Sequence, residues 1–110
     1  MKSIYRLKKN YQYNYVYKHA DSVTDKNFVM LYCHSNAKIS KIGFSVSKKY
    51  GKAVARNRIR RQMKAAVSLV VRQIKEGYNV IFIPRKRGAY LFADVIDSVQ
   101  HLLKKADLLQ

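Results

Sequence analysis

The side chains best suited to chemistry are cations, and they gather in one stretch of the sequence. The segment SVSKKYGKAVARNRIRR holds three lysines and four arginines: Lys48, Lys49, Lys52, Arg56, Arg58, Arg60 and Arg61. Guanidinium groups bind phosphate oxygens through paired hydrogen bonds, and the start of a helix also attracts anions. The apolar residues of the segment anchor a strand and then a helix, so the pattern predicts a phosphate-binding junction between the two.

A helix beginning near Ala53 would turn most of these cations away from its apolar stripe. At about 100° per residue, the outward arc holds Asn57, Arg58, Arg60, Arg61 and Lys64. A merely solvated helix face usually mixes acids with bases, whereas Arg56, Arg60 and Lys64 repeat one charge at i, i+4 spacing. We therefore expect this face to bind a polyanion.

No group of side chains indicates a self-contained active site. His19, His34 and His101 lack metal-ligand spacing, no carboxylate pair suits acid–base catalysis, and the serines of the basic segment have no recognisable base partner. The single Cys33 lies in an apolar run and is interpreted as a small buried hydrophobe. The residues themselves predict binding and not catalysis.

The net charge of +17 on 110 residues also indicates a polyanionic partner, because an excess of one sign repels itself in a compact protein. The charges are segregated along the chain: from Lys26 to Lys75 there are thirteen Lys or Arg residues and no Asp or Glu. Nucleic acid is the expected partner. An anionic membrane surface is the alternative, although no run approaches the ~18 apolar residues of a membrane-spanning helix.

Length and composition predict a single domain over residues 1–110, with one modest hydrophobic core. Hydrophobic residues make up 48% of the chain, which supports a packed globule and argues against a disordered basic tail. The N-terminal MKSIYRLKKNYQY has no apolar stretch of signal-peptide length, so we expect a cytoplasmic protein.

The segment from Tyr11 to His19 fits two structures. Its four tyrosines at every second position alternate as in a strand, but an i, i+3, i+4, i+7 stripe that starts at Tyr13 fits a helix equally well. Asn10 is a good N-cap residue and favours the helix.

Three extended segments follow. Ser22 to Thr24 and Phe28 to His34 flank Asp25-Lys26-Asn27, whose composition suits the tight turn of a hairpin. From Ile42 to Ser47, large apolar residues alternate with Gly and Ser, which predicts a strand buried on one side. The small face of that strand is left open to another part of the molecule.

Two helices and a fourth strand complete the chain. Apolar residues three and four apart predict a helix from about Ala53 to Glu76, with Gly77 as its C-terminal stop. Asn79 to Pro84 is typical of a central strand, and the apolar side of a last helix begins at Phe92. The order α-β-β-β-α-β-α predicts an α+β fold, a single-domain α/β sandwich, whose strand–helix–strand crossover would ordinarily be right-handed.

The run SVSKKYGKAVARNRIRR, with its core at Arg56, Asn57 and Arg58, resembles the signature of the bacterial ribonuclease P protein component family. The likeness extends in order to RLKKNYQYNYVYKHA, NFVMLY and SVQHLLKKA, and so covers nearly the whole chain. It implies a helix at Tyr11 to His19 and a four-stranded sheet with three helices and a left-handed βαβ crossover, a ribosomal-protein-like fold. It also implies a subunit of an endoribonuclease that binds a catalytic RNA and precursor tRNA and supports removal of the tRNA 5′ leader.

In that family the arginine-rich helix contacts the RNA subunit, while a cleft between the first helix and the sheet receives the single-stranded leader. The resemblance assigns RNA-subunit binding to Lys52, Arg56, Asn57, Arg58, Arg60, Arg61 and Lys64. It places Tyr13 and Tyr17 in the leader cleft, with Lys48 and Lys49 on its basic rim. Phe28, Met30 and Tyr32 are further candidates for leader binding, and strand alternation puts these three on one face only if no bulge intervenes. Aromatic faces stack on unpaired bases without demanding a particular sequence, which suits leaders that differ.

The resemblance implies that the chemistry comes from Mg²⁺ held mainly by the RNA, with none bound by the protein alone. It implies no membrane and no obligate protein partner. Two departures stand out: the family commonly has phenylalanine at the place of Tyr13, and an arginine followed by an acidic or amide residue where this chain has Lys64-Ala65.

Two questions stay open at the level of sequence. Arg85-Lys86-Arg87, after the last strand, fits either another RNA contact or a solvated turn. A ribosomal or other structural RNA-binding protein, or a DNA-binding domain with the basic helix in a major groove, would also explain the charge. Neither of these alternatives explains the ordered match along the whole chain.

Overall fold

The computed structural model describes all residues from 1 to 110. Its main elements are α1 (Asn10–His19), β1 (Asp21–Thr24), β2 (Phe28–His34), β3 (Lys41–Phe44), α2 (Ala53–Ser68), β4 (Tyr78–Pro84) and α3 (Phe92–Lys105). Three short 3₁₀ helices accompany them: η1 (Ser3–Tyr5), η2 (Lys48–Tyr50) and η3 (Val71–Gln73). The predicted order of three helices and four strands is confirmed, and Tyr11 to His19 is helical.

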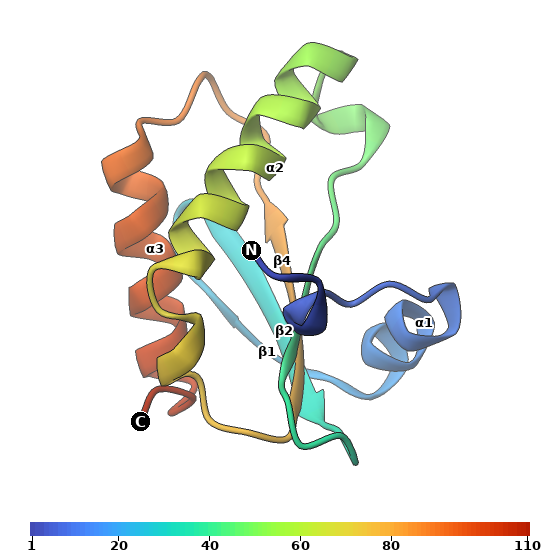
Figure 1. Cartoon of the computed structure of the whole chain (residues 1–110). Helices are drawn as coiled ribbons and strands as arrows, with labels where there is room; N and C mark the ends of the chain where they lie inside the picture. The colour runs from blue at the N-terminus through green and yellow to red at the C-terminus, as the bar shows by residue number, and fades with distance from the viewer.

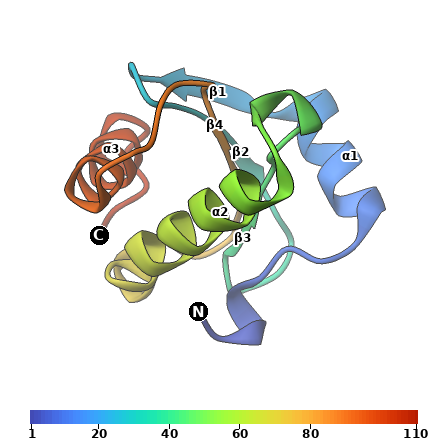
Figure 2. The ribbon, with the colours of Figure 1, turned by 90° about the horizontal axis from the view of Figure 1, so that it is seen from above.

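The four strands form one sheet in the order β1-β2-β4-β3. β1 and β2 are an antiparallel hairpin, β2 and β4 are also antiparallel, and β3 runs parallel to β4. Viewed from the side of α2 with β3 and β4 pointing up, β4 lies to the left of β3 (Figure 1, Figure 2). The β3–α2–β4 crossover is therefore left-handed, as the family resemblance implied and against the general preference.

The sheet separates α1 from the other two helices, as Figure 2 shows from above. On the side of α2 and α3 lies the main core, a cluster of 17 buried residues. Its strand members are Phe28, Met30, Ile42, Val80 and Phe82, which alternate along β2, β3 and β4 with residues that face α1. This core fixes α2 on the sheet and so aims the outer surface of that helix at solvent.

The opposite face of the sheet holds a smaller core of Leu7, Val16 and Ile81. Leu31, Cys33 and Ile83 pack against it and are only partly buried, because α1 is short and covers part of this face. Cys33 is thus partly buried and not fully buried as predicted, and this burial raises the pKa of its thiol, which keeps the thiol protonated.

The N-terminal segment positions α1. The Leu7 N–H donates to the Ile42 carbonyl at 2.9 Å, so the chain runs along the outer edge of β3 before α1 begins. The helix starts one residue earlier than the predicted N-cap would allow: Lys9 is the N-cap, and its N–H donates to the Gln12 side chain at 3.2 Å. Asn10 is therefore the first helical residue, and the N-cap prediction was wrong by one position.

Two predicted boundaries extend too far. α2 ends at Ser68 and not near Glu76, because the following segment pairs with the C-terminus: the Lys75 N–H donates to the Leu108 carbonyl, and the Gln110 N–H donates to the Gln73 carbonyl, each at 2.7 Å. Val70 and Ile74 continue the apolar periodicity and are buried, but they reach the core from a 3₁₀ turn. Strand β3 likewise ends at Phe44, before the predicted end at Ser47.

Candidate nucleic-acid interface

The outer surface of α2 carries the predicted cations. Ile59, Met63, Ala66 and Val67 of this helix are buried, so the remaining arc faces solvent or the edges of the core. Arg58 and Arg61 are exposed, while Arg60 and Lys64 are half-buried at one flank. None of these cations has a carboxylate partner, since the one ion pair in the protein joins Lys75 and Asp107 at 3.2 Å. Their charge remains available to a partner molecule.

Two of the arginines are held by the chain that leads into α2. Arg60 donates from Nη1 to Asn57 Oδ1 at 3.3 Å and from Nη2 to the Val46 carbonyl at 3.4 Å. Arg56 donates from Nη1 to the Gly51 carbonyl at 3.0 Å. Because a guanidinium has five N–H donors, both arginines keep donors for a phosphate while their side chains are oriented in advance.

Two recesses meet along α2. One is an open hollow of about 470 Å³ lined by Val54, Asn57, Arg60, Arg61 and Lys64. The other, of about 190 Å³, lies between α2, β3 and the N-terminal segment and is lined by Met1, Arg6, Leu7, Tyr13, Ile42, Phe44, Arg60 and Lys64. Arg60 and Lys64 belong to both recesses, and neither recess has an acidic residue. The cationic surface of α2 thus continues to Tyr13 without interruption.

Tyr13 and Tyr17 of α1 lie against the small face of the β3 segment, as the alternation of Gly and Ser there allows. Tyr13 packs over Gly43, and its hydroxyl donates to the Leu7 carbonyl at 3.3 Å. The Tyr17 hydroxyl donates to Ser45 Oγ at 2.9 Å. Burial raises the pKa of Tyr13, so its phenol stays neutral at physiological pH. The two ring centroids are 6.3 Å apart, and about half of the Tyr17 side chain (47%) is exposed.

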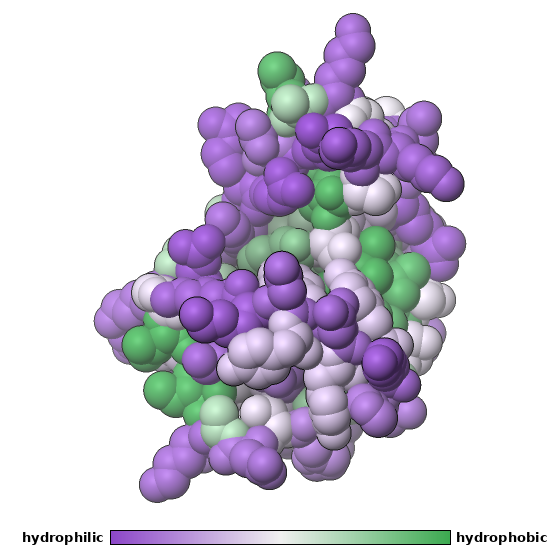
Figure 3. All heavy atoms as spheres, turned by 90° about the vertical axis from the view of Figure 1, so that its right-hand side faces the viewer, coloured by the Kyte–Doolittle hydropathy of each residue, from purple (hydrophilic) through white to green (hydrophobic).

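The tyrosines border a groove on the α1 side of the molecule. Figure 3 shows this side, where hydrophobic atoms floor a hollow between hydrophilic borders. Val29, Leu31 and Ile83 lie on this face of the sheet, because they alternate with core residues and because Val29 pairs with Ile83. All three are only partly buried. We call this region, between α1 and the corner that leads into α2, the aromatic groove.

The predicted contribution of β2 to the groove was wrong. Phe28 and Met30 are fully buried beneath α2 and α3, and Tyr32, on the same side of the strand, packs against that main core. They cannot line a cleft on the other face. Both alternating sets of β2 are apolar, so periodicity did not say which set faces the thicker core. The larger Phe and Met side chains fill the space under two helices, and the smaller set, with Val29 and Leu31, faces α1.

Lys48, Lys49 and Lys52 occupy the corner between β3 and α2. Lys48 and Lys49 belong to η2, and Lys52 is the N-cap residue of α2; all three are exposed. They therefore extend the positive surface from the hollow on α2 toward the border of the aromatic groove.

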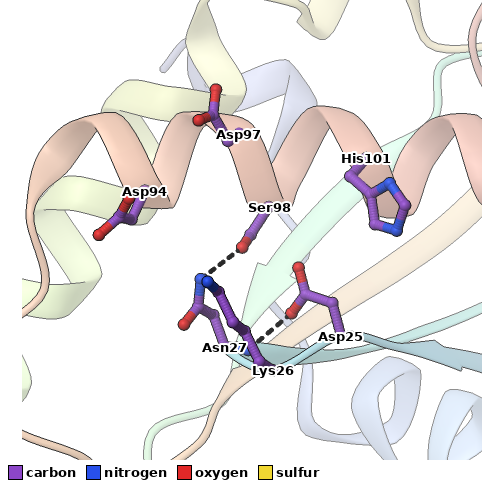
Figure 4. A pocket seen from close by; sticks show the side chains of 7 residues that line it. All are labelled: Asp25, Lys26, Asn27, Asp94, Asp97, Ser98 and His101. Carbon is purple, nitrogen blue, oxygen red and sulfur yellow. Dashed lines mark hydrogen bonds between the residues drawn. The ribbon is translucent and has the colours of Figure 1, made fainter.

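Acidic side chains gather between the β1–β2 turn and α3. Asp25, Asp94 and Asp97 line an open pocket between the β1–β2 turn and α3, together with Lys26, Asn27, Ser98 and His101. Figure 4 shows Ser98 and His101 of α3 facing the turn. Half of the six acids of the chain thus line this pocket, and none of them lines either recess that contains Arg60 and Lys64.

The Asp25 carboxylate has a structural task in this pocket. It accepts N–H bonds from Asn27 and Phe28, both at 2.8 Å, and so forms the predicted tight turn. Burial by itself would raise the pKa of Asp25, but these N–H groups, the Ser98 hydroxyl and the charge of His101 together lower it.

Other kinds of site are not found. No group of three or more His, Cys, Asp or Glu side chains is placed to hold a metal ion. None of the helices has both the length and the apolar character that a membrane span requires. The fold and the site define a small basic α+β protein that presents cations and aromatic rings on one continuous surface, as a nucleic-acid-binding protein does.

Comparison with known proteins identifies the family. The family model described as Ribonuclease P matches residues 1–107. The ribonuclease P protein component of Clostridioides difficile is 39% identical over 104 residues, which cover 93% of this chain and 91% of that protein. A mutant of the Staphylococcus aureus RNase P protein superposes with a TM-score of 0.88 at 31% identity, over 96% of this chain and 91% of that one. The Thermotoga maritima protein gives 0.82 at 27% identity, over 91% and 96%.

The chain therefore belongs to the ribonuclease P protein family. It is a protein component of an endoribonuclease that acts in the processing of tRNA 5′ ends. Membership also decides between the readings that the charge alone left open, since neither a ribosomal protein nor a DNA-binding domain accounts for these matches.

Proposed function

We propose that this subunit binds the catalytic RNA of ribonuclease P through α2 and the single-stranded 5′ leader of precursor tRNA through the aromatic groove. The observation that carries the proposal is the junction of the two recesses, which share Arg60 and Lys64. A ribozyme docked on α2 would then hold its substrate beside the tyrosines of α1. Because the leader is unpaired, its bases are free to stack on aromatic rings.

The RNA-subunit surface comprises Lys52, Arg56, Asn57, Arg58, Arg60, Arg61 and Lys64. The leader surface comprises Tyr13 and Tyr17, with Lys48 and Lys49 at its border and Val29, Leu31 and Ile83 as its floor. Phe28, Met30 and Tyr32 support the sheet from behind. The exposed aromatic and cationic groups suit a leader of variable sequence, since stacking and phosphate contacts are largely independent of base identity.

The chemistry of cleavage belongs to the RNA in this proposal. Any Mg²⁺ that cleavage requires would be held mainly by the RNA subunit, and its chemistry there would be to activate the attacking water and to stabilise the leaving oxygen. The protein neutralises phosphates at the meeting point of two polyanions. No further protein partner is needed, and the subunit acts in the bacterial cytoplasm, where precursor tRNA is made.

Two double variants test the division of surfaces. Replacing Arg58 and Arg61 with alanine should weaken binding to the catalytic RNA and leave the preference of the assembled enzyme for a leader unchanged. Replacing Tyr13 and Tyr17 should leave RNA-subunit binding intact and reduce the preference for precursor tRNA over leaderless tRNA by roughly tenfold or more, since stacking contributes about 1–3 kcal/mol per base.

Matched controls remove the same groups elsewhere. Arg72 and Lys104 are exposed cations outside both surfaces, and Tyr11 and Tyr15 are exposed tyrosines on the outer side of α1. If about six phosphates are engaged, log affinity should fall with log salt at a slope of about −4 for single-stranded sites. A flat salt response, or test variants indistinguishable from their controls, would contradict the proposal. Cleavage by the RNA at low Mg²⁺, with and without the subunit, measures the functional consequence.

A further inference from the structure

The loop between β4 and α3 forms a pocket with the first turns of α2. This pocket, of about 160 Å³, lies on the flank of α2 away from Arg60 and Lys64. Figure 1 shows the loop arching beside the start of α2. The pocket is lined by Tyr50, Ala55, Arg58, Ile59, Gln62, Arg87, Gly88, Ala89 and Tyr90. The cationic motif Arg85-Lys86-Arg87 thus lies next to the arginine-rich helix, a proximity that their distance in the sequence does not reveal.

The ends of this loop are tied to the rest of the fold. Tyr90 is 3% exposed, and its hydroxyl lies within hydrogen-bond distance of the Arg85 carbonyl at 2.7 Å and the Asn27 carbonyl at 3.0 Å. The Arg85 N–H donates to that same Asn27 carbonyl at 2.8 Å. Gln62 of α2 donates to the Tyr90 carbonyl at 3.1 Å. A solvated turn would not need these bonds, which fix the loop against α2 and the hairpin.

Arg87 is oriented toward the pocket by two contacts. Its guanidinium carbon lies 4.7 Å from the centroid of the Tyr90 ring, a cation–π distance. Its Nη1 donates to the side-chain oxygen of Asn27, whose amide nitrogen donates in turn to Ser98 Oγ at 2.7 Å. One N–H of Arg87 is used in this way, and the guanidinium has no carboxylate partner. The remaining donors are free for a ligand.

The charged side chains that line the pocket are both cationic. Its lining includes Arg58 from α2 and Arg87 from the loop, and no acidic residue. The two phenols stay neutral at physiological pH, because burial raises the pKa of Tyr50 and raises that of Tyr90 to about 12. Two guanidinium groups on opposite elements with neutral aromatic walls suit a phosphate, whose oxygens accept forked hydrogen bonds from arginine.

We propose that Arg58 and Arg87 together bind a backbone phosphate of the catalytic RNA, so that the RNA contact crosses α2 and ends in this pocket. The inference rests on the proposed function of α2 and adds a site on its second flank. The ligand is a phosphodiester of the docked ribozyme. A contact to a backbone phosphate carries no sequence specificity. Its role would be to fix the rotation of the RNA about the axis of α2, because the RNA would then be bound on both flanks of the helix.

The test uses the full chain and the catalytic RNA, with affinity measured across a range of potassium chloride concentrations. Arg87→Gln removes the charge and keeps an amide that can donate to Asn27; it should weaken binding roughly tenfold at moderate salt and reduce the salt slope by about 0.7–0.9, the loss of one phosphate. Arg72→Gln, which removes an exposed arginine elsewhere, should leave the slope unchanged.

A second pair of variants does not disturb the contacts of Arg87. A Cβ atom added at Gly88 would meet nothing within 4 Å, and Asp and Asn have nearly the same shape, so Gly88→Asp and Gly88→Asn should both fold and differ mainly in charge at the mouth of the pocket. We expect the aspartate variant to bind the RNA at least fivefold more weakly than the asparagine variant. An unchanged slope in Arg87→Gln, or equal affinities for the Gly88 pair, would overturn the inference.

Arg61→Ala separates this outcome from failure of the proposed function. Arg61 lines the open hollow on α2 and not the pocket. If Arg61→Ala weakens binding while the Arg87 and Gly88 variants do not, α2 binds the RNA and only the pocket is excluded. If Arg61→Ala has no effect either, the assignment of α2 itself is wrong.

Discussion

Replacing Gly43 with alanine tests the contact that shapes the aromatic groove. A Cβ atom at this buried position would lie 2.6 Å from Tyr13 Oη and 2.8 Å from Tyr13 Cε1 and Cζ. Carbon atoms in proteins rest about 3.5–4.0 Å from their neighbours, so the ring must move outward. That movement weakens the hydrogen bond from the Tyr13 hydroxyl to the Leu7 carbonyl, now 3.3 Å long, and displaces the ring from its place beside Tyr17.

The size of the effect follows from two opposing terms. Overpacking usually costs about 1–3 kcal/mol, whereas replacing a strand glycine by alanine otherwise gains about 0.5–1 kcal/mol through backbone entropy. We therefore expect Gly43→Ala to lower the free energy of unfolding by about 1–2 kcal/mol in the wild-type background. In a Tyr13→Ala background the clash is absent, so the same change should be neutral or stabilising by up to about 1 kcal/mol.

Urea unfolding of the four proteins of this cycle gives the coupling between Gly43 and Tyr13 directly. A value near 2 kcal/mol is expected, within the range of about 0.5–3 kcal/mol seen for residues in contact. Gly43→Ala should also reduce the preference for precursor tRNA over leaderless tRNA, because the displaced ring no longer stacks. If Gly43→Ala destabilises both backgrounds equally, Tyr13 is not what limits space at Gly43 and the reasoning fails.

Three further changes test other parts of the structure. Asp25→Ala should lower the free energy of unfolding by about 1–2 kcal/mol at pH 7, because two N–H groups of the turn lose their acceptor. Folding lowers the pKa of Asp25 from 3.8, so the extra stability of the wild type should be complete above that pH and should disappear as the pH falls below it. A difference in urea unfolding that does not change with pH would contradict this. Asp107, just after α3, has a φ of 59°, a left-handed conformation that glycine adopts without strain. Asp107→Gly should therefore stabilise the protein by about 0.5–1 kcal/mol in thermal unfolding. Destabilisation would mean that the exposed ion pair of Asp107 with Lys75 contributes more than the backbone strain. Phe28→Ala should lower the free energy of unfolding by about 3–5 kcal/mol and leave the leader preference of the folded fraction unchanged. Leu31→Ala should lower the free energy of unfolding by less and reduce the leader preference. The opposite pattern would mean that Phe28, and not Leu31, lines the groove.

The sequence predicted the elements well where one periodic signal dominated. The turn at Asp25-Lys26-Asn27, the central strand before Pro84 and the last helix from Phe92 are all observed, because each depends on residues close together in the chain. Boundaries failed where a distant segment intervened. The end of α2 is set by hydrogen bonds to the C-terminus, which no local pattern at Ser68 announces.

The same distinction between local and long-range determinants applies to the candidate site. The exposed arc of α2 followed from helical geometry, because the apolar stripe leaves Arg58, Arg61 and Asn57 no place in the core. The part of the groove formed by β2 did not follow, because Phe28 and Val29 both belong to apolar sets and alternation cannot say which set meets the larger core. The proximity of Arg87 to Arg58 also had no signal in the sequence.

The sequence by itself determined the charge, its separation along the chain, the order of the elements and the outward direction of the cations on α2. These properties are local, since they depend on composition and on the fixed periods of helix and strand. Only the tertiary structure decided which face of the sheet is open, that the tyrosines of α1 rest on Gly43 and Ser45, and that two recesses share Arg60 and Lys64. These depend on how side-chain volumes fill the space between layers, which is a property of the packed chain and not of any one segment.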